Sequence, residues 1–178
     1  MATDQAGGGH DLSAGGDVLD RVRGCAADAL TAYGGHPDAT VELLNVSENA
    51  TFLVSDPDAG PSVLRVHRLG YHTEPEIASE LAWMEALRAE AGVRTPQVLP
   101  ARDGRRIVTV AERGGAGSRG GAGRRGGAGR RAAAERHCVR FEFLPGTEPE
   151  GETGGALAAS HFAELGEITA RMHRHAIG

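Results

Sequence analysis

The sequence predicts an α+β fold in which a mostly antiparallel sheet of five strands packs against one helix. Three observations support this prediction. Alternating apolar runs separated by turn residues fill residues 40–68, as expected for consecutive strands joined by tight connections. A helical pattern over residues 73–91 follows them. More apolar runs around an Asp-Gly turn then lead to a last helical pattern, within a length of 178 residues that allows one ordinary domain.

The composition indicates a soluble chain whose packed part is smaller than the whole. The chain is 40% apolar but only 4% aromatic, and it contains 27 glycines. The two cysteines, Cys25 and Cys138, lie far apart without metal-ligand spacing, which favours reduced thiols. The N-terminus lacks the pattern of a signal peptide, and no run approaches 18 apolar residues. We therefore expect a cytoplasmic protein with no membrane partner.

Changes in composition divide the chain into three parts. Residues 1–16 are rich in glycine and polar, so we expect a disordered N-terminus. Residues 17–146 carry the strand and helix patterns and are expected to form one lobe. Within that lobe, residues 113–134 form a disordered insertion rich in glycine and arginine. Residues 147–178 are expected to begin a second, truncated lobe.

The first half of the lobe has clear boundaries. A helix is predicted over residues 17–33, with Asp17 placed to cap it and two glycines followed by Pro37 to end it. Strands are predicted over residues 40–46, 51–55 and 62–68. We see no chemistry in the first helix and expect it to lie on the outside of the lobe.

A buried or half-buried ion pair is predicted between the third strand and the next helix. Arg65 lies in the middle of an apolar strand, where an arginine is costly unless it has a partner. Thr73 and Glu76 match a capping box, so a helix begins there. Glu80 then falls on or beside the apolar face of that helix. The pair could be a structural salt bridge or part of a functional site, and the sequence leaves both open.

The second half of the lobe contains fewer signals. Two strands are predicted to form a hairpin around Asp103 and Gly104, and another strand covers residues 137–144. A last helix is predicted over residues 156–176, with an apolar face that includes Phe162. The histidines are expected to be surface polar residues (His67, His72) or to lack metal-binding spacing (His161, His173, His175).

Residues 113–131 form a basic, low-complexity tract. They hold six arginines and no acid, so the tract carries +6 and leaves −11 for the rest of a chain whose net charge is −5. Such segments can bind RNA or single-stranded DNA. However, no aromatic residue is interleaved, and an insertion in a surface loop costs little closure entropy. The sequence favours the insertion over nucleic-acid binding and keeps the latter as the alternative.

The order of these motifs resembles a known family. The chain has SENATF between two strands, VLRVHR in the third, SELAW in the helix, then RFEFLPG and LGEITARMHRHA. Together they resemble the aminoglycoside phosphotransferase family, which includes homoserine-kinase-like and choline-kinase-like enzymes with a protein-kinase-like fold. The resemblance covers residues 18–175 apart from the basic tract. It implies a kinase-like N-terminal lobe plus the first helix of an incomplete C-terminal lobe.

The resemblance also implies ATP and Mg²⁺ as cofactors and a small-molecule hydroxyl group as phosphate acceptor. It implies a loop over the nucleotide, a cation that contacts phosphates, a carboxylate that orients this cation, and a hinge whose backbone binds adenine. In this sequence, these nucleotide-binding residues are Ser47, Glu48, Asn49, Arg65, Glu80, Glu142, Phe143 and Leu144. A cation held by a carboxylate suits phosphoryl transfer, because the reaction depends on charge stabilisation and positioning.

Two features depart from the family pattern. Arg65 stands where the family usually has a lysine, and the two side chains are not interchangeable. The catalytic-loop pattern H-x-D-x-x-x-x-N and the later metal-binding aspartate are absent from the sequence. We therefore expect no catalytic residue, no metal ligand and no phosphoryl transfer by this chain alone, and we expect self-association through the exposed last helix. The acceptor, and whether the chain is a fragment, a frameshifted product or a stand-alone lobe, cannot be read from the sequence.

Overall fold

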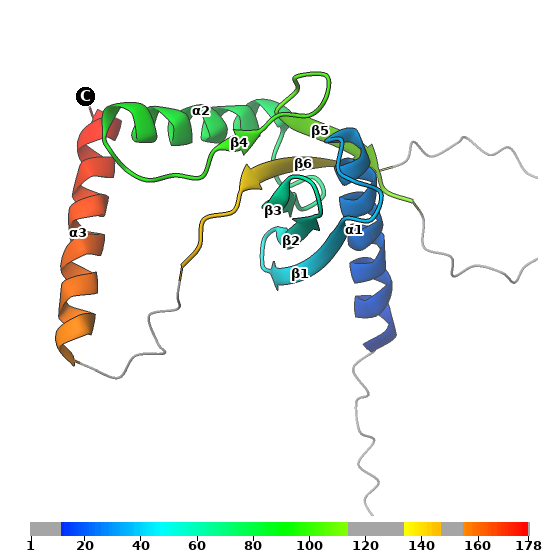
Figure 1. Cartoon of the computed structure of the whole chain (residues 1–178), viewed down its shortest axis with the longest axis horizontal. Helices are drawn as coiled ribbons and strands as arrows, with labels where there is room; N and C mark the ends of the chain where they lie inside the picture. Colours follow the sequence, from blue (N-terminus) through cyan, green and yellow to red (C-terminus); the bar gives the residue numbers. More distant parts are fainter. Residues whose placement is uncertain (1–11, 114–133, 147–154, 178) are drawn as a thin grey trace, which may run out of the picture.

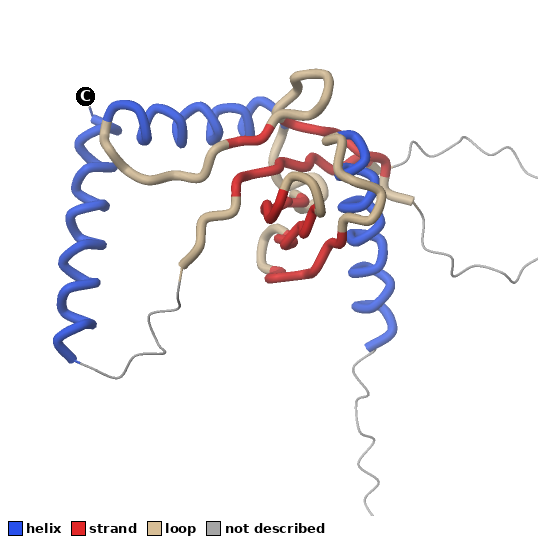
Figure 2. Tube along the Cα trace, in the orientation of Figure 1, coloured by secondary structure: helices blue, strands red, loops and turns tan. Residues whose placement is uncertain are grey.

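The computed structural model describes residues 12–113, 134–146 and 155–177, with side chains described from residue 16 and, in the last helix, from residue 160. The basic tract, apart from Arg113, lies outside these residues. The described residues form three helices, with three strands between the first and second and three more between the second and third. Figures 1 and 2 show how these elements are arranged. In order, the elements are α1 (Leu12–Ala32), β1 (Thr40–Val46), β2 (Ala50–Asp56), β3 (Gly60–Val66), α2 (Glu74–Glu90), β4 (Val98–Leu99), β5 (Ile107–Ala111), β6 (Glu135–Glu142) and α3 (Gly155–Ile177).

The strands form one sheet in the order β1-β2-β3-β6-β4, and β5 also pairs with β6. Every pairing is antiparallel, which confirms the predicted α+β class. The sheet has six strands where a sheet of five was expected, although the sequence patterns mark six segments, and the segment before the basic tract contributes two short pieces. Both pieces pair with β6, β4 at Phe141 and Arg140 and β5 from Val139 to Glu135.

The predicted hairpin around Asp103 and Gly104 is therefore wrong. The turn itself exists: the Gly104 N–H donates to the Ala101 carbonyl at 2.9 Å, and Gly104 has a φ of 84°. However, β4 and β5 do not pair with each other. Pro100 follows β4 directly and lacks an N–H group, so a ladder with β5 cannot grow from that end.

Helix α1 covers one face of the sheet. It begins earlier than the expected start at Asp17 and contacts β1, β3, β5 and β6. Tyr33, just after the helix, donates its hydroxyl to the Cys138 carbonyl at 2.9 Å. Burial raises the pKa of the Cys138 thiol to about 12, so it stays protonated at neutral pH. The core on this face consists of buried side chains from α1 and the sheet: Val22, Cys25, Ala26, Ala29, Leu30, Tyr33, Ala50, Phe52, Val54, Leu64, Val66, Ala101, Val108 and Cys138.

Helix α2 covers part of the opposite face. The predicted capping box is present, since the Thr73 N–H and hydroxyl both donate to the Glu76 carboxylate, at 2.7 and 2.9 Å. Ile77 and Leu81 of α2 are buried against the sheet. Because side chains alternate along β3, Leu64 and Val66 point to α1 while Val63 and Arg65 point to α2. The smaller core on this face consists of Ile77, Leu81, Ile107, Val139 and Phe141.

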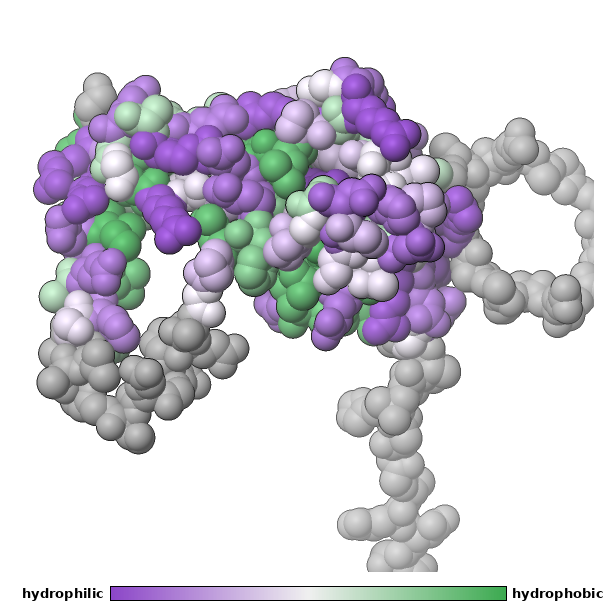
Figure 3. Space-filling model, viewed as in Figure 1, coloured by the Kyte–Doolittle hydropathy of each residue, from purple (hydrophilic) through white to green (hydrophobic). Residues whose placement is uncertain are grey.

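Helix α3 stands away from the sheet, and its contacts are concentrated at the C-terminal end of α2 (Figure 1). Apolar side chains are exposed along it, which Figure 3 shows as green surface. Phe162 is 73% exposed, and Leu165 and Ile177 are also exposed. Among the residues that the structure describes, no helix combines the length and apolar character needed to cross a membrane.

Candidate functional site

The ion pair expected from the sequence is present. Arg65 of β3 places its Nη1 atom 2.7 Å from Oε1 of Glu80 on α2. The two side chains are 29% and 41% exposed, so the pair is half-buried and open to solvent on one side. The guanidinium also lies over the Phe141 ring of β6, 5.0 Å from its centroid. A strand, a helix and an aromatic ring thus fix the direction of one cation.

The geometry leaves Arg65 free to bind an anion. Within the described part of the chain, Glu80 is the hydrogen-bond partner of its guanidinium. A guanidinium has five N–H donors in a planar fork, and this arrangement matches phosphate or carboxylate oxygens. A half-exposed cation with spare donors therefore fits a phosphate group.

The loop between β1 and β2 lies close to this cation. Thr51, which follows the loop, pairs with Arg65 in the sheet. Asn49 accepts a hydrogen bond from the Arg68 N–H at 3.2 Å, and Glu48 accepts one from the Tyr71 hydroxyl at 3.3 Å. Two of the predicted loop residues thus anchor the segment between β3 and α2. Ser47, the third, is exposed.

The predicted hinge residues lie at the C-terminal end of β6. The strand ends at Glu142, so Phe143 and Leu144 follow it instead of belonging to it. Glu142 is tied to Gln97 by two hydrogen bonds: its N–H donates to the Gln97 carbonyl, and its carboxylate accepts from the Gln97 N–H, both at 2.9 Å. Residue 142 is three positions from Val139, which pairs with Arg65, so roughly 10 Å of strand separates the hinge from the cation.

Sequence reasoning missed the apolar surface between the hinge and the cation. Leu53 pairs with Val63, and Val63 pairs with Phe141, so three side chains lie side by side on the α2-facing side of the sheet. Leu53 and Val63 are only partly buried. The alternation along β3 carried this signal, because it places the apolar Val63 on the same face as Arg65.

His67 corrects another expectation. It was expected at the surface, but its side chain is 2% exposed. The sequence pattern failed here because β3 ends at Val66, yet the His67 N–H still donates to the His137 carbonyl of β6 at 2.9 Å and holds the residue in the sheet. His72, by contrast, is exposed as expected.

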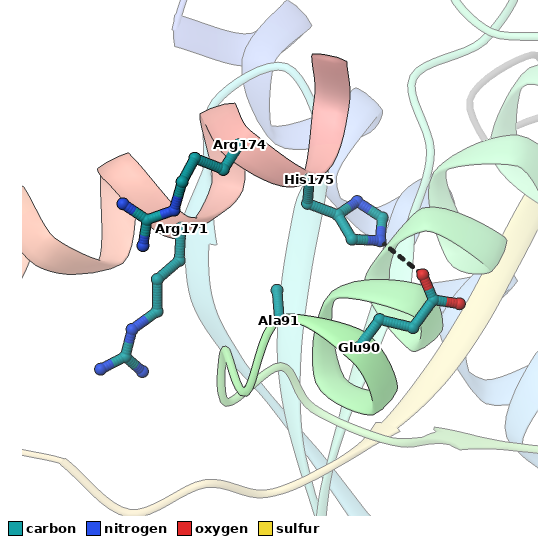
Figure 4. Close-up of a pocket in the computed structure, with 5 residues that line it drawn as sticks. All are labelled: Glu90, Ala91, Arg171, Arg174 and His175. Atoms are coloured by element: carbon teal, nitrogen blue, oxygen red, sulfur yellow. Dashed lines mark hydrogen bonds and ion pairs between the residues drawn. The ribbon is translucent and has the colours of Figure 1, made fainter. Parts of the chain in front are cut away.

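Two cavities lie near these elements, and neither is lined by Arg65 or Glu80. One, of about 290 Å³, touches Ser47, Glu48 and Asn49 but opens toward Val18 and Val22 of α1. The other, of about 390 Å³, lies where α3 meets α2. It is lined by Glu90, Ala91, Arg171, Arg174 and His175, and Figure 4 shows His175 directed at Glu90.

The second cavity is where α3 is anchored. His175 Nε2 lies 3.1 Å from Glu90 Oε2, and Arg171 Nη1 donates to the Gly92 carbonyl at 3.4 Å. These contacts join α3 to the end of α2 and are suited to holding the helices together. They lie ten residues along α2 from Glu80, or roughly 15 Å.

The described residues do not form a metal site. No group of three histidine, cysteine, aspartate or glutamate side chains in this part of the chain could hold an ion. The Mg²⁺ implied by the resemblance therefore has no ligand set among them, and no chemical step can be assigned to it here.

Comparisons with known proteins agree with this fold. Residues 40–178 match the model of the phosphotransferase enzyme family (APH). A microcompartment-associated aminopropanol kinase has a similar structure, with a TM-score of 0.63 and 42% identity over 86% of this chain. Amicoumacin kinase, solved in complex with AMP-PNP, Ca²⁺ and Ami, has the same fold, with a TM-score of 0.64 and 18% identity over 90% of this chain.

This chain corresponds to only part of each of these two kinase structures. The chain spans 40% of the length of the aminopropanol kinase structure and 42% of the amicoumacin kinase structure. Among curated proteins, no match to the sequence was found. The family match extends over most of the chain, and the two kinase structures confirm the predicted kinase-like lobe. The chain belongs to the phosphotransferase enzyme family.

Proposed function

We propose that this chain is the nucleotide-binding lobe of an ATP-dependent phosphotransferase that acts on small molecules. The observation that supports this most directly is the Arg65–Glu80 pair, in which a half-exposed guanidinium keeps donors for phosphate oxygens. Phosphoryl transfer depends on positioning and on stabilising negative charge, and such a pair contributes to both. The relative that was solved with AMP-PNP supports a nucleotide as the ligand.

We assign roles to the remaining predicted residues according to their places around this pair. Adenine would lie against Leu53 and Val63, which are apolar and partly exposed. The backbone at Glu142, Phe143 and Leu144 would hold its edge, and the loop of Ser47, Glu48 and Asn49 would close over the phosphates. Mg²⁺ neutralises phosphate charge when it is bound. Its protein ligands would come from outside the described residues.

The phosphate acceptor is proposed from chemistry and from one relative. A small molecule with a hydroxyl group is the acceptor expected of this family. The 42% identical structure is an aminopropanol kinase, so an amino alcohol is the first candidate. We propose that the 178 residues alone do not transfer phosphate, because no H-x-D-x-x-x-x-N pattern supplies a catalytic base. We also propose that the protein is located in the cytoplasm.

Calorimetric titration of the chain with ATP and Mg²⁺ tests the proposal. We expect saturable heat from nucleotide and no phosphorylated product when aminopropanol is added. Absence of heat at millimolar nucleotide would contradict nucleotide binding. Formation of phosphorylated aminopropanol would contradict the proposed lack of activity, while leaving the binding proposal intact.

We also propose that the chain associates with itself through α3. Phe162, Leu165 and Ile177 expose large apolar side chains on one helix, and exposed apolar surface favours association. Sedimentation velocity should therefore show concentration-dependent dimers or larger species. Phe162→Glu should shift the distribution to monomer, whereas Trp83→Glu, at an exposed position on α2, should leave it unchanged. A monomer at all concentrations would argue against this surface.

A further inference from the structure

His67 occupies an unusual position behind the Arg65–Glu80 pair. It follows Arg65 by two residues and therefore lies on the same, α2-facing side of the sheet. Its side chain is 2% exposed. Neither ring nitrogen, Nδ1 or Nε2, has a hydrogen-bond partner in the described part of the chain. Buried polar groups without partners are rare and costly, so this ring calls for an explanation.

The groups that face His67 come from four segments. Arg65 precedes it by two residues on the same face, and the Glu80 carboxylate of α2 is held on Arg65 at 2.7 Å. His72, in the segment that leads into α2, presents its ring edge-on with the centroids 6.4 Å apart, and His137 lies opposite on β6. Arg136 of β6 donates to the His67 carbonyl at 3.2 Å. Glu80 is the single carboxylate in this set, and Arg65 already binds it at 2.7 Å.

This environment accommodates a neutral imidazole and opposes a charged one. Burial, and then the charge of Arg65, lowers the pKa of His67 to about 4 from an ordinary value of 6.5. A proton on the ring would compete with Arg65 for Glu80 and would lack an acceptor of its own. The sheet closes one side of the ring, so water reaches it when α2 or residues 68–73 move away.

We propose that neutral His67 is a positioning residue that keeps α2 seated on the sheet and Glu80 on Arg65. When the ring takes up a proton, the balance shifts toward an arrangement in which α2 is displaced from His67 and the ion pair is separated. The seating of α2 is thus linked to pH through one buried side chain. This inference concerns the fold itself, and only its consequence for ATP affinity depends on the proposed function.

The sign and range of the effect follow from proton linkage. Well above pH 6.5 the ring is neutral in both arrangements, so pH does not alter their balance. Below pH 6.5 the displaced arrangement binds a proton that the seated one does not, so seating weakens by up to tenfold per pH unit. The loss levels off near pH 4, where the buried ring is also protonated. At pH 5 seating should be about 30-fold weaker than at pH 7.5.

Hydrogen–deuterium exchange of the full chain tests this linkage without any ligand. Peptides from α2 are compared with peptides from α1, which serve as an internal reference for the pH dependence of intrinsic exchange. We expect the protection of α2 relative to α1 to fall about 30-fold between pH 7.5 and pH 5. In His67→Gln, whose side chain does not titrate, the ratio should stay constant over this range.

Matched variants distinguish the proposal from its alternatives. His72→Gln removes an exposed imidazole from the same segment and should keep the wild-type pH profile. If His67→Gln and the wild type show the same fall, or if the wild-type ratio does not change, His67 does not control α2. Should His67→Gln fail to fold, NMR titration of the wild-type imidazoles decides instead: a His67 ring that titrates at 6.5 without any change in α2 overturns the proposal.

A last comparison separates this inference from nucleotide binding. ATP titrations of the wild type and His67→Gln at pH 7.5 and pH 5.5 should show a loss of affinity at the lower pH that is larger in the wild type. If neither protein binds ATP at pH 7.5, the proposed function is wrong, whereas the exchange result still decides the role of His67.

Discussion

Arg65→Gln is expected to lower the affinity of the chain for ATP by roughly 10- to 150-fold, which corresponds to about 1.5–3 kcal/mol for a hydrogen bond to a charged group. Glutamine keeps a polar side chain of moderate length but removes the charge and the planar fork. The free energy of unfolding should change little, because the pair with Glu80 is half-exposed and such pairs contribute about 0–1 kcal/mol. Calorimetric titration and urea unfolding measure the two quantities separately.

The control is Arg105→Gln, which removes the same charge at an exposed position. Arg105 pairs with Asp103 in the turn before β5, away from the predicted site. This variant should bind ATP as the wild type does. Arg65→Lys should bind with intermediate affinity, because lysine retains the charge but cannot form the bidentate contact. If Arg65→Gln and Arg105→Gln reduce affinity equally, the effect is one of net charge and Arg65 has no specific role.

The Arg65–Glu80 contact was predictable because each partner lies on an element with a strong local signal. The apolar alternation of β3 fixes the face to which Arg65 points, and the capping box at Thr73 fixes where α2 begins. With the start known, helical periodicity places Glu80 beside the buried Ile77 and Leu81. Local rules were sufficient once strand and helix were packed together.

The failed hairpin shows where local rules stop. An Asp-Gly turn predicts that the flanking strands pair with each other, and the turn does form. The choice of partner, however, depends on β6, a strand of eight residues that begins more than 20 positions after β5 ends. Its backbone groups need partners along the edge that β3 leaves open, and β4 and β5 together supply them. No pattern near the turn contains that information.

The burial of His67 was missed for a similar reason. The strand pattern places His67 on the face of Arg65, but the ring next to it in space, that of His72, belongs to the segment that leads into α2. A histidine at the end of a strand is exposed or buried according to where the next segment passes. The roles of the predicted nucleotide-binding residues also depend on their contacts with a ligand. The sequence supports a hypothesis about these contacts but does not define their geometry.

Phe52→Ala is expected to lower the free energy of unfolding by about 3–5 kcal/mol. Phe52 lies on β2 with a fully buried side chain and packs in the core that joins α1 to the sheet. Removing the ring leaves a cavity that the surrounding side chains cannot fill, because they belong to paired strands and a packed helix. A domain of ordinary stability has about 5–15 kcal/mol in total, so this single change removes a large part of it. Urea unfolding followed by circular dichroism measures the loss.

The chain offers its own control in Phe162→Ala. Phe162 is 73% exposed on α3, so its ring contributes little to the apolar surface that folding buries. At a protein concentration at which the chain is monomeric, its effect should stay within about 0.5 kcal/mol. The difference between the two losses in free energy of unfolding then shows which parts of the chain belong to the packed core. This core should include β2 and exclude the exposed face of α3. If Phe162→Ala costs as much as Phe52→Ala in the monomer, another part of the chain covers α3 in solution. Because α3 touches the remainder mainly through the Glu90–His175 and Arg171–Gly92 contacts, such a result would place new packing on its apolar face.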